Sequence, residues 1–173
     1  MPELPEVERA ARMLERAARG KVIARLRVLH PSLARTLTPA VARRARGKRI
    51  ERVERRGKHQ LLHLDDGSIL HAHFRMTGDW AIDREGAPLD RFARAVIDLE
   101  GGTRVSLIDP RALGTLVLHK PGELALPELG PEPPDKAFTP AALARALAAR
   151  RGPTDPALLD QRIAAGIGNI YAA

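Results

Sequence analysis

The sequence predicts an α+β fold, in which a sandwich or barrel of about seven or eight short strands has helices at its edges and is followed by a helical segment. Three patterns indicate this fold. They are an amphipathic stretch over residues 3–19, repeated short runs of alternating apolar and polar residues, and a proline-rich stretch that precedes new helix signals. A chain of 173 residues is long enough for one compact domain with an appendage.

Two helices are expected near the N-terminus. Residues 3–19 carry apolar residues three and four apart on one face, with Pro5 in the first turn and Gly20 placed to end the helix. A second, shorter helix should begin with Thr38 as its N-cap and end near Gly47. The apolar face of the first helix consists of Leu4, Val7, Ala11, Leu14 and Ala18.

The strands are predicted from runs in which apolar and polar residues alternate. The sequences Asp65–Gly67 and Glu100–Gly102 are typical of tight turns, so they should join two pairs of these runs as hairpins. The runs cover residues 24–28, 49–55, 59–64, 68–74, 94–99, 103–108 and 114–119.

A linker is expected over residues 127–140, which contain several prolines and little periodicity. We therefore predict a domain over residues 1–130 and the start of a second, helical domain over residues 131–173. The chain stops without a terminating element, so this second domain is expected to be cut short. Two helices are predicted in this second domain. The first begins after Thr139 as its N-cap and ends at Gly152, and the second begins after Asp155 as its N-cap and continues through Ile163.

The composition points to a polyanionic partner. The chain has 29 Lys and Arg residues against 21 Asp and Glu residues, a net charge of +8 and a pI near 10.9. Basic side chains gain affinity for nucleic acids by releasing the counterions condensed on phosphates, although solvated surface arginines remain an alternative explanation. The sequence has no cysteine, no apolar run long enough to span a membrane and no secretory signal, so a cytoplasmic protein is expected.

The first residues could carry chemistry. Removal of Met1 would leave Pro2 as a secondary amine, and an α-amino group with a pKa of about 8 has enough neutral form to attack an electrophilic carbon. Glu3 and Glu6 lie one helical turn apart beside this amine, where a carboxylate can transfer protons. The alternative is that these glutamates only complement the helix dipole.

Several later segments combine basic and apolar residues that suit DNA. Lys58 follows a glycine that allows a sharp turn, and His71 and His73 share one strand face, where a structural or phosphate-contacting role is favoured over metal binding. Met76, at the end of a strand, is either a core residue or a wedge that fills the gap left by a displaced base.

Two further turns extend this set of candidates. Arg111 and Leu113 should lie on the same side of a turn, where the arginine can bind an orphaned base and the leucine can wedge beside it, or else lie on the surface and in the core respectively. The sequence Gly166–Asn169 presents backbone N–H groups and the Asn169 amide as a cradle for a phosphate, or is simply a turn.

Together these motifs occur in an order that resembles the formamidopyrimidine-DNA glycosylase family, relatives of endonuclease VIII, along essentially the whole chain. The resemblance implies an N-terminal two-sheet β-sandwich, a helical domain with a helix-two-turn-helix motif, and DNA in the cleft between them. The motifs are PELPEVE at residue 2, RRGKH at 55, HFRMTG at 73, DPRALG at 109, ELGPEP at 128 and LLDQRIAAGIGNIYA at 158.

The resemblance also implies roles for individual residues. Pro2 would be the Schiff-base nucleophile, Glu3 the principal acid and base, Glu6 a supporting carboxylate, and Lys58 a phosphate contact that assists elimination. The implied activity is that of a bifunctional glycosylase and abasic-site lyase, which removes oxidised purines such as 8-oxoguanine and formamidopyrimidines from double-stranded DNA. The residues with implied DNA contacts are His73, Met76, Arg111, Leu113 and Asn169.

Three positions depart from the family pattern. Leu113 stands where phenylalanine is usual, Phe92 where a phosphate-contacting histidine is expected, and Asp155 where a lysine often precedes the helix. We expect weaker DNA binding or an altered choice of lesion. The family's four-cysteine zinc finger, and so its one zinc ion, would lie beyond Ala173, and no cofactor or metal is expected within these residues.

Three functions remain open at this stage. The first is the bifunctional enzyme, expected to be a monomer associated with a bacterial nucleoid, although the 173-residue chain itself could be inactive. The second is a non-catalytic module that binds damaged DNA or another nucleic acid. The third is an unrelated basic β-sandwich that binds RNA.

Overall fold

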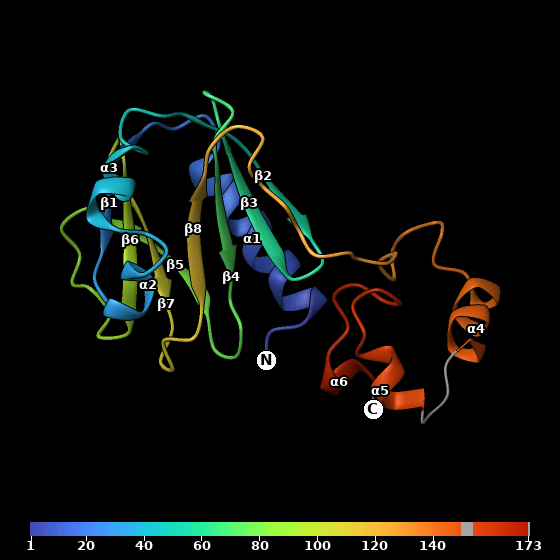
Figure 1. The fold of residues 1–173 in the computed structure, drawn as a ribbon. Helices are drawn as coiled ribbons and strands as arrows, with labels where there is room; N and C mark the ends of the chain where they lie inside the picture. Colours follow the sequence, from blue (N-terminus) through green and yellow to red (C-terminus); the bar gives the residue numbers. More distant parts are fainter. Residues whose placement is uncertain (150–153, 173) are drawn as a thin grey trace.

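The computed structural model describes residues 1–149 and 154–172 and has the expected α+β architecture (Figure 1). Two four-stranded antiparallel sheets, with strand orders β1-β6-β7-β5 and β2-β3-β4-β8, form the two layers of a sandwich. The first sheet consists of β1 (Ile23–Val28), β6 (Ala93–Leu99), β7 (Thr103–Ile108) and β5 (Asp79–Arg84). The second consists of β2 (Ile50–Arg56), β3 (His59–Leu64), β4 (Ile69–His73) and β8 (Thr115–His119).

The core lies between the two sheets because alternate residues of each strand face inward. Leu62 and Leu70 from one sheet and Ile97 and Leu107 from the other are almost completely buried there. The opposite face of the second sheet carries polar residues, including a row of histidines that is described below.

Helices cover the open sides of the sandwich. Helix α1 (Leu4–Ala18) packs against β2 and β5, the edge strands on one side, and its buried face confirms the predicted amphipathic helix. Helices α2 (Pro31–Ala34) and α3 (Pro39–Arg43) pack beside β1 at the opposite edge. The Thr36 hydroxyl donates to the carbonyl of Leu116 in β8 at 3.3 Å, so this segment also contacts the second sheet.

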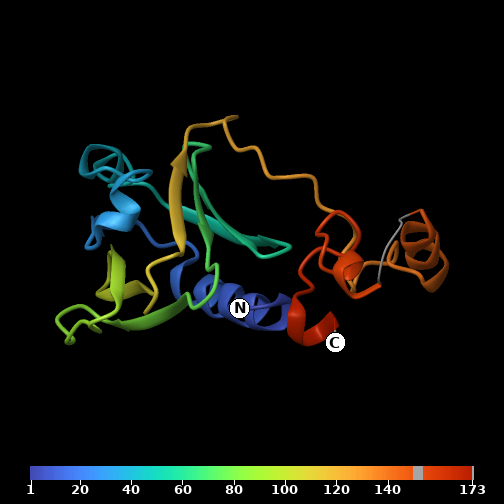
Figure 2. The same ribbon diagram turned by 60° about the horizontal axis from the view of Figure 1, so that its bottom comes forward.

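The C-terminal part lies beside the N-terminal end of α1 (Figure 2). It contains α4 (Pro140–Ala148), α5 (Thr154–Leu158) and α6 (Asn169–Ala172). The backbone N–H of Leu4 donates to the carbonyl of Gly166 at 3.0 Å, which joins the two ends of the described chain. No helix within the described ranges is long and apolar enough to cross a membrane.

The two predicted hairpins are confirmed, but three elements were not predicted: β5, α2 and the four-residue α6. Strand β5 was missed because only Trp80 and Ile82 provide inward apolar residues between charged ends. Helix α2 was missed because it has four residues, and it depends on a local cap in which His30 Nδ1 accepts the N–H of Ser32 at 3.2 Å.

The helix predicted to run through Ile163 is shorter than expected. Helix α5 ends at Leu158 because the following residues bind backbone groups elsewhere: the carbonyl of Gln161 accepts the N–H of Gly130 at 2.9 Å, and the N–H of Ala165 donates to Pro131 at 3.1 Å. These tertiary hydrogen bonds outweigh the helical pattern. Asp155 falls inside α5 rather than before it, and Gly152, the predicted end of the preceding helix, lies outside the described residues.

Candidate active site

Glu3 is the centre of a buried cluster at the start of α1. It is the N-cap of the helix, and its own backbone N–H donates to Glu6 Oε2 at 3.0 Å. Pro2, directly before it, is half-buried, whereas Glu6 is exposed and lies 3.4 Å from the Tyr171 hydroxyl. The structure therefore places Glu3 and Glu6 next to α6, with Pro2 directly before Glu3 in the chain.

The Glu3 carboxylate is only 1% exposed and accepts three backbone hydrogen bonds from the C-terminal segment. The N–H groups of Gly168, Ile170 and Tyr171 donate to its oxygens at 2.8, 2.7 and 3.2 Å. A Cβ atom on Gly168 would lie 2.6 Å from the Glu3 carboxyl carbon, so the close approach requires glycine. The first turn of α6 thus holds a carboxylate from the opposite end of the sequence.

This contact corrects one prediction. Gly166–Asn169 was expected to offer its backbone N–H groups to a phosphate, but the N–H of Gly168 binds Glu3 and that of Gly166 binds Gln161 Oε1 at 2.8 Å. These two donors are already used within the protein. The Asn169 side chain is exposed, and Asn169 lines a cavity.

The cavity, with a volume of about 320 Å³, lies between the β-sandwich and the C-terminal segment. Residues of both parts line it, with Lys58 and His73 on one wall and Gly168 and Asn169 on the other. Met1, whose carbonyl carbon is bonded to the Pro2 nitrogen, also lines it. The remaining lining residues are His59, Arg75, Pro127, Leu129, Leu159, Gln161 and Ile167.

Lys58 is 6% exposed in the turn between β2 and β3. Gly57 has a φ of 56°, the left-handed conformation that lets the chain turn there and places Lys58 at the cavity. Burial lowers the pKa of the Lys58 ammonium group, and the nearby Glu3 carboxylate acts in the opposite direction. A larger neutral fraction of the amine follows.

His73 lies at the end of β4, at the wall of the same cavity. Its Nδ1 accepts the backbone N–H of Arg75 at 3.1 Å. Burial, together with the neighbouring His59 and Arg75, lowers the pKa of His73 to about 3. This imidazole is therefore neutral at cellular pH, and it can donate a hydrogen bond through Nε2.

Met76, Arg111 and Leu113 lie on two loops that are tied together by Asp109. Met76 is 40% and Leu113 46% exposed, so neither is a core residue, and Arg111 is exposed as well. Asp109 is fully buried and accepts the N–H groups of Arg111, Leu113 and Gly114 at 3.2, 2.7 and 2.7 Å, while the Thr77 hydroxyl donates to it from the other loop. The three predicted contact residues are thus presented on adjacent loops.

The backbone of these loops is strained next to the exposed side chains. Arg75 and Ala112 have φ values of 56° and 53°, a region that costs non-glycine residues about 1–2 kcal/mol. Arg75 precedes Met76, and Ala112 lies between Arg111 and Leu113. The hydrogen bonds to Asp109 compensate for the strain at Ala112. The sequence indicated a turn that begins at Asp109 but assigned this residue no role of its own.

Glu132 was also missed, and it fastens the linker to the sandwich. It is 5% exposed and accepts hydrogen bonds from Arg55 at 2.5 Å, from Arg56 at 3.1 Å and from the backbone N–H of Gly57 at 2.6 Å. Burial acts to raise the pKa of Glu132, but these donors, Arg55 first, lower it overall. The anchored segment forms one side of the cavity, next to Lys58.

The residues present do not fit a cysteine-ligated zinc ion, because the sequence has no cysteine. Within residues 1–149 and 154–172, no group of three or more His, Cys, Asp or Glu side chains is arranged to hold a metal. The histidine pair on β4 is instead part of a row in which His59 Nδ1 and His71 Nε2 are 2.8 Å apart.

Comparisons with known proteins agree with this arrangement. The model of the formamidopyrimidine-DNA glycosylase N-terminal domain matches residues 1–116, and the model of the helix-two-turn-helix (H2TH) domain of the same enzyme matches residues 129–173. Formamidopyrimidine-DNA glycosylase of Moorella thermoacetica is 44% identical over 177 aligned residues, which cover 99% of this chain and 65% of the relative. The chain therefore spans just under two thirds of that relative's length.

Two solved structures share the fold along nearly the whole chain. The MutM (Fpg) protein of Thermus thermophilus superposes with a TM-score of 0.82 at 39% identity, covering 99% of this chain and 62% of that protein. Lactococcus lactis Fpg, solved with DNA that contains FAPY-dG, superposes with a TM-score of 0.88 at 29% identity, covering 98% and 65%. On its sequence and its fold, the chain belongs to the formamidopyrimidine-DNA glycosylase family.

Proposed function

We propose that the intact protein excises oxidised purines, such as 8-oxoguanine and formamidopyrimidines, from double-stranded DNA and then cuts the strand at the abasic site. The Pro2 nitrogen forms a bond to C1′ while the bond from C1′ to the base breaks, and the departing base takes up a proton. Opening of the sugar ring then gives an iminium ion on Pro2.

The second step follows from the charge of this iminium ion. The positive charge acidifies the protons on C2′, and loss of one of them expels the 3′-phosphate by elimination. The iminium ion is then hydrolysed, which regenerates the Pro2 amine. One site would therefore perform both reactions without a metal in these residues.

The position of Met1 carries this proposal. Met1 lies in the wall of the cavity beside Lys58, so its removal would leave the Pro2 amine facing the same space. Glu3, one residue on, is fixed by three N–H donors and would transfer protons to the departing base and the ring oxygen. Glu6 would support it, and the Lys58 ammonium would hold the phosphate next to the reacting sugar.

The exposed loop residues suit the displacement of a base. Met76 and Leu113 would fill the gap in the stack, while Arg111 would bind the orphaned partner base. His73 and Asn169, both at the cavity wall, would contact phosphates. Phe92 has no group for a phosphate, but the guanidinium carbons of Arg91 and Arg94 lie 4.5 and 5.7 Å from its ring centre, which keeps basic side chains at that position.

The rest of the proposal concerns the intact protein. We expect it to act as a monomer in the bacterial cytoplasm at the nucleoid, since the relatives named above are bacterial. The division into residues 1–130 and 131–173 stays a prediction. A zinc finger with one zinc ion would be contributed by residues beyond Ala173.

Borohydride trapping on a duplex with one abasic site tests the proposal. After removal of Met1 is verified by mass spectrometry, we expect a covalent adduct that maps to Pro2. The Pro2→Gly variant should lose the adduct and keep its DNA binding, whereas Pro5→Ala, which changes a nearby exposed proline, should trap normally. If the intact protein binds the duplex but forms no adduct, it is a non-catalytic module for damaged DNA.

A further inference from the structure

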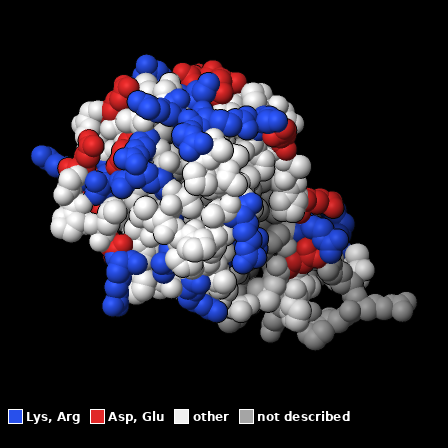
Figure 3. All heavy atoms as spheres, turned by 60° about the vertical axis from the view of Figure 1, so that its left-hand side comes forward, with Lys and Arg blue, Asp and Glu red and all other residues white. Residues whose placement is uncertain are grey.

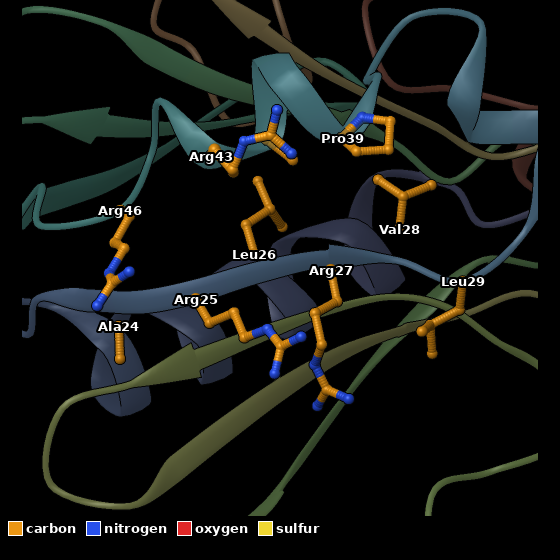
Figure 4. A pocket seen from close by; sticks show the side chains of 10 residues that line it. Ala24, Arg25, Leu26, Arg27, Val28, Leu29, Pro39, Arg43 and Arg46 are labelled. Carbon is orange, nitrogen blue, oxygen red and sulfur yellow. The ribbon is translucent and has the colours of Figure 1, made fainter.

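A groove of about 770 Å³ runs along the edge of β1, on the far side of the sandwich from the cavity (Figure 4). Its size is in the range of ligand-binding clefts. The strand forms one wall, and α3 and the turn after it form the other. The lining residues are Ala24–Leu29, Pro39, Ala42, Arg43 and Arg46.

The backbone of β1 has free hydrogen-bonding groups along this groove. The strand pairs with β6 on one side only, and the N–H of Leu29 donates to Arg94 at 2.8 Å. Because successive residues of a strand point their N–H and C=O groups to opposite sides, those of Leu26 and Val28 point away from β6. They have no backbone partner in the described part of the chain, since the neighbouring 47–49 segment pairs only as far as Ile23.

The groove is also strongly basic. Arg25, Arg43 and Arg46 are exposed and form no ion pair with any residue of 1–149 or 154–172, whereas Arg27 is paired with Asp98 at 3.0 Å. Figure 3 shows Lys and Arg side chains around uncharged atoms on the side of the molecule that carries β1 and α3. Three guanidinium groups without an ion pair in the described residues, from β1, α3 and the turn after α3, therefore lie around one free strand edge.

We propose that this groove binds an acidic, extended segment of a partner protein, which adds a strand to the β1 edge. The main chain of the segment would pair with Leu26 and Val28, and its carboxylates would bind Arg25, Arg43 and Arg46. Apolar side chains of the segment would lie against Pro39. DNA held at the cavity would leave this face accessible, because the two sites are on opposite sides (Figure 1).

Two observations favour a peptide over a second nucleic acid. A strand edge recognises an extended main chain, which a nucleic acid does not have, and the walls of the groove are partly apolar. Charged residues on an edge strand can also serve to prevent pairing with other chains. Protection of the edge would need arginines on the strand itself. It does not account for Arg43 and Arg46, which lie on α3 and in the turn after it.

A fluorescein-labelled peptide of alternating Glu and Val residues is a suitable probe, with fluorescence anisotropy as the readout. We expect it to bind the chain in a salt-dependent way, and the same peptide with Lys in place of Glu should not bind. Arg43→Glu and Arg46→Glu should each weaken binding on the order of tenfold, the value of one charge-assisted hydrogen bond. Arg44→Glu, which changes an exposed arginine outside the groove, should leave the affinity unchanged.

N-methylation of the peptide tests the strand pairing itself. Methyl groups on alternate nitrogens that face β1 should abolish binding, and methyl groups on the intervening nitrogens should not. Equal effects of the two sets, or no binding of the acidic peptide to the unmodified chain when that chain is folded by circular dichroism, would overturn the proposal. So would a result in which Arg43→Glu and Arg46→Glu weaken binding of a DNA duplex instead.

Discussion

At the scale of single residues, Glu3 has a structural role in addition to the chemical role that we propose for it. The same carboxylate that would transfer protons next to Pro2 also accepts the N–H groups of Gly168, Ile170 and Tyr171. A buried carboxylate with this many donors is held in one orientation. The docking of the C-terminal segment and the geometry of the proposed chemistry therefore depend on one side chain.

The Glu3→Gln variant tests this dual role. Glutamine has one acceptor oxygen, so its NH₂ group would face a backbone N–H, and leaving a buried donor unsatisfied costs about 1–3 kcal/mol. We expect the free energy of unfolding to fall by this amount in urea titrations. Amide hydrogen exchange at Gly168, Ile170 and Tyr171 should become faster, and excision by the intact protein should be lost far more than DNA binding.

Glu6→Gln is the matched control, because Glu6 is exposed and accepts a single backbone hydrogen bond. Its exchange rates at residues 168–171 should stay close to those of the unmodified chain. Unchanged protection of these amides in Glu3→Gln would show that Glu3 does not hold the segment. Wild-type excision in that variant would remove its proposed proton role.

At the scale of elements, the second sheet carries a row of imidazoles across β3, β4 and β8. His59 Nδ1 lies 2.8 Å from His71 Nε2, and His71 Nδ1 lies 3.3 Å from His119 Nε2. His73 packs edge-on against His59 with ring centres 4.8 Å apart. Burial lowers the pKa of His71 to about 4, with further contributions from His59 and His119. Neutral imidazole rings can lie this close together, whereas positively charged rings at this spacing would repel one another.

The sign of the pH dependence follows from these values. The ordinary histidine pKa is 6.5, and the folded values are about 4 for His71 and about 3 for His73. Below pH 6.5 the unfolded chain therefore binds protons that the folded chain does not, so stability falls as the pH falls from 6.5 towards 4. Each histidine contributes at most about 1.4 kcal/mol per pH unit.

Urea unfolding between pH 6.5 and 5 isolates the histidines, because the carboxylates with lowered pKa values, such as Asp109 and Glu132, lose their contribution at lower pH. We expect the free energy of unfolding to decline over this range, and His71→Gln to reduce the slope. Titration of the His71 ring protons by NMR in the folded chain provides an independent check. A midpoint near 6.5 would contradict the prediction.

Elements with strong local signals were predictable from the sequence, and those that depend on tertiary contacts were not. The helix over Leu4–Ala18 has a full apolar face and a proline in its first turn, so pattern and structure agree. The region after Leu158 has a helical pattern as well, but its backbone binds Gly130 and Pro131 instead. Likewise, the sequence indicated Glu3 as a site residue, but its three N–H donors come from residues 168–171, a contact that no local pattern encodes.

At the scale of the whole molecule, basic side chains line both the cavity and the β1 groove, which lie on opposite sides of the sandwich. Lys58 lies at the cavity, whereas Arg25 lines the β1 groove. Counterion release makes affinity for DNA depend on the phosphates contacted rather than on total charge. Charges on the two faces should therefore have different effects on the salt dependence of DNA binding.

This difference leads to a prediction for a duplex with one abasic-site analogue, measured by anisotropy over a range of salt concentrations. The logarithm of the binding constant should fall linearly with that of the salt concentration, with a slope near −0.9 for each phosphate contacted. Lys58→Ala should reduce the slope by about 1, since its proposed contact is a phosphate. Arg111→Ala should lower affinity at every salt concentration with the slope unchanged, because its proposed contact is a base. Arg25→Ala should change neither the affinity for the duplex nor the slope of its salt dependence. A smaller slope in this variant would instead indicate that DNA contacts the β1 face.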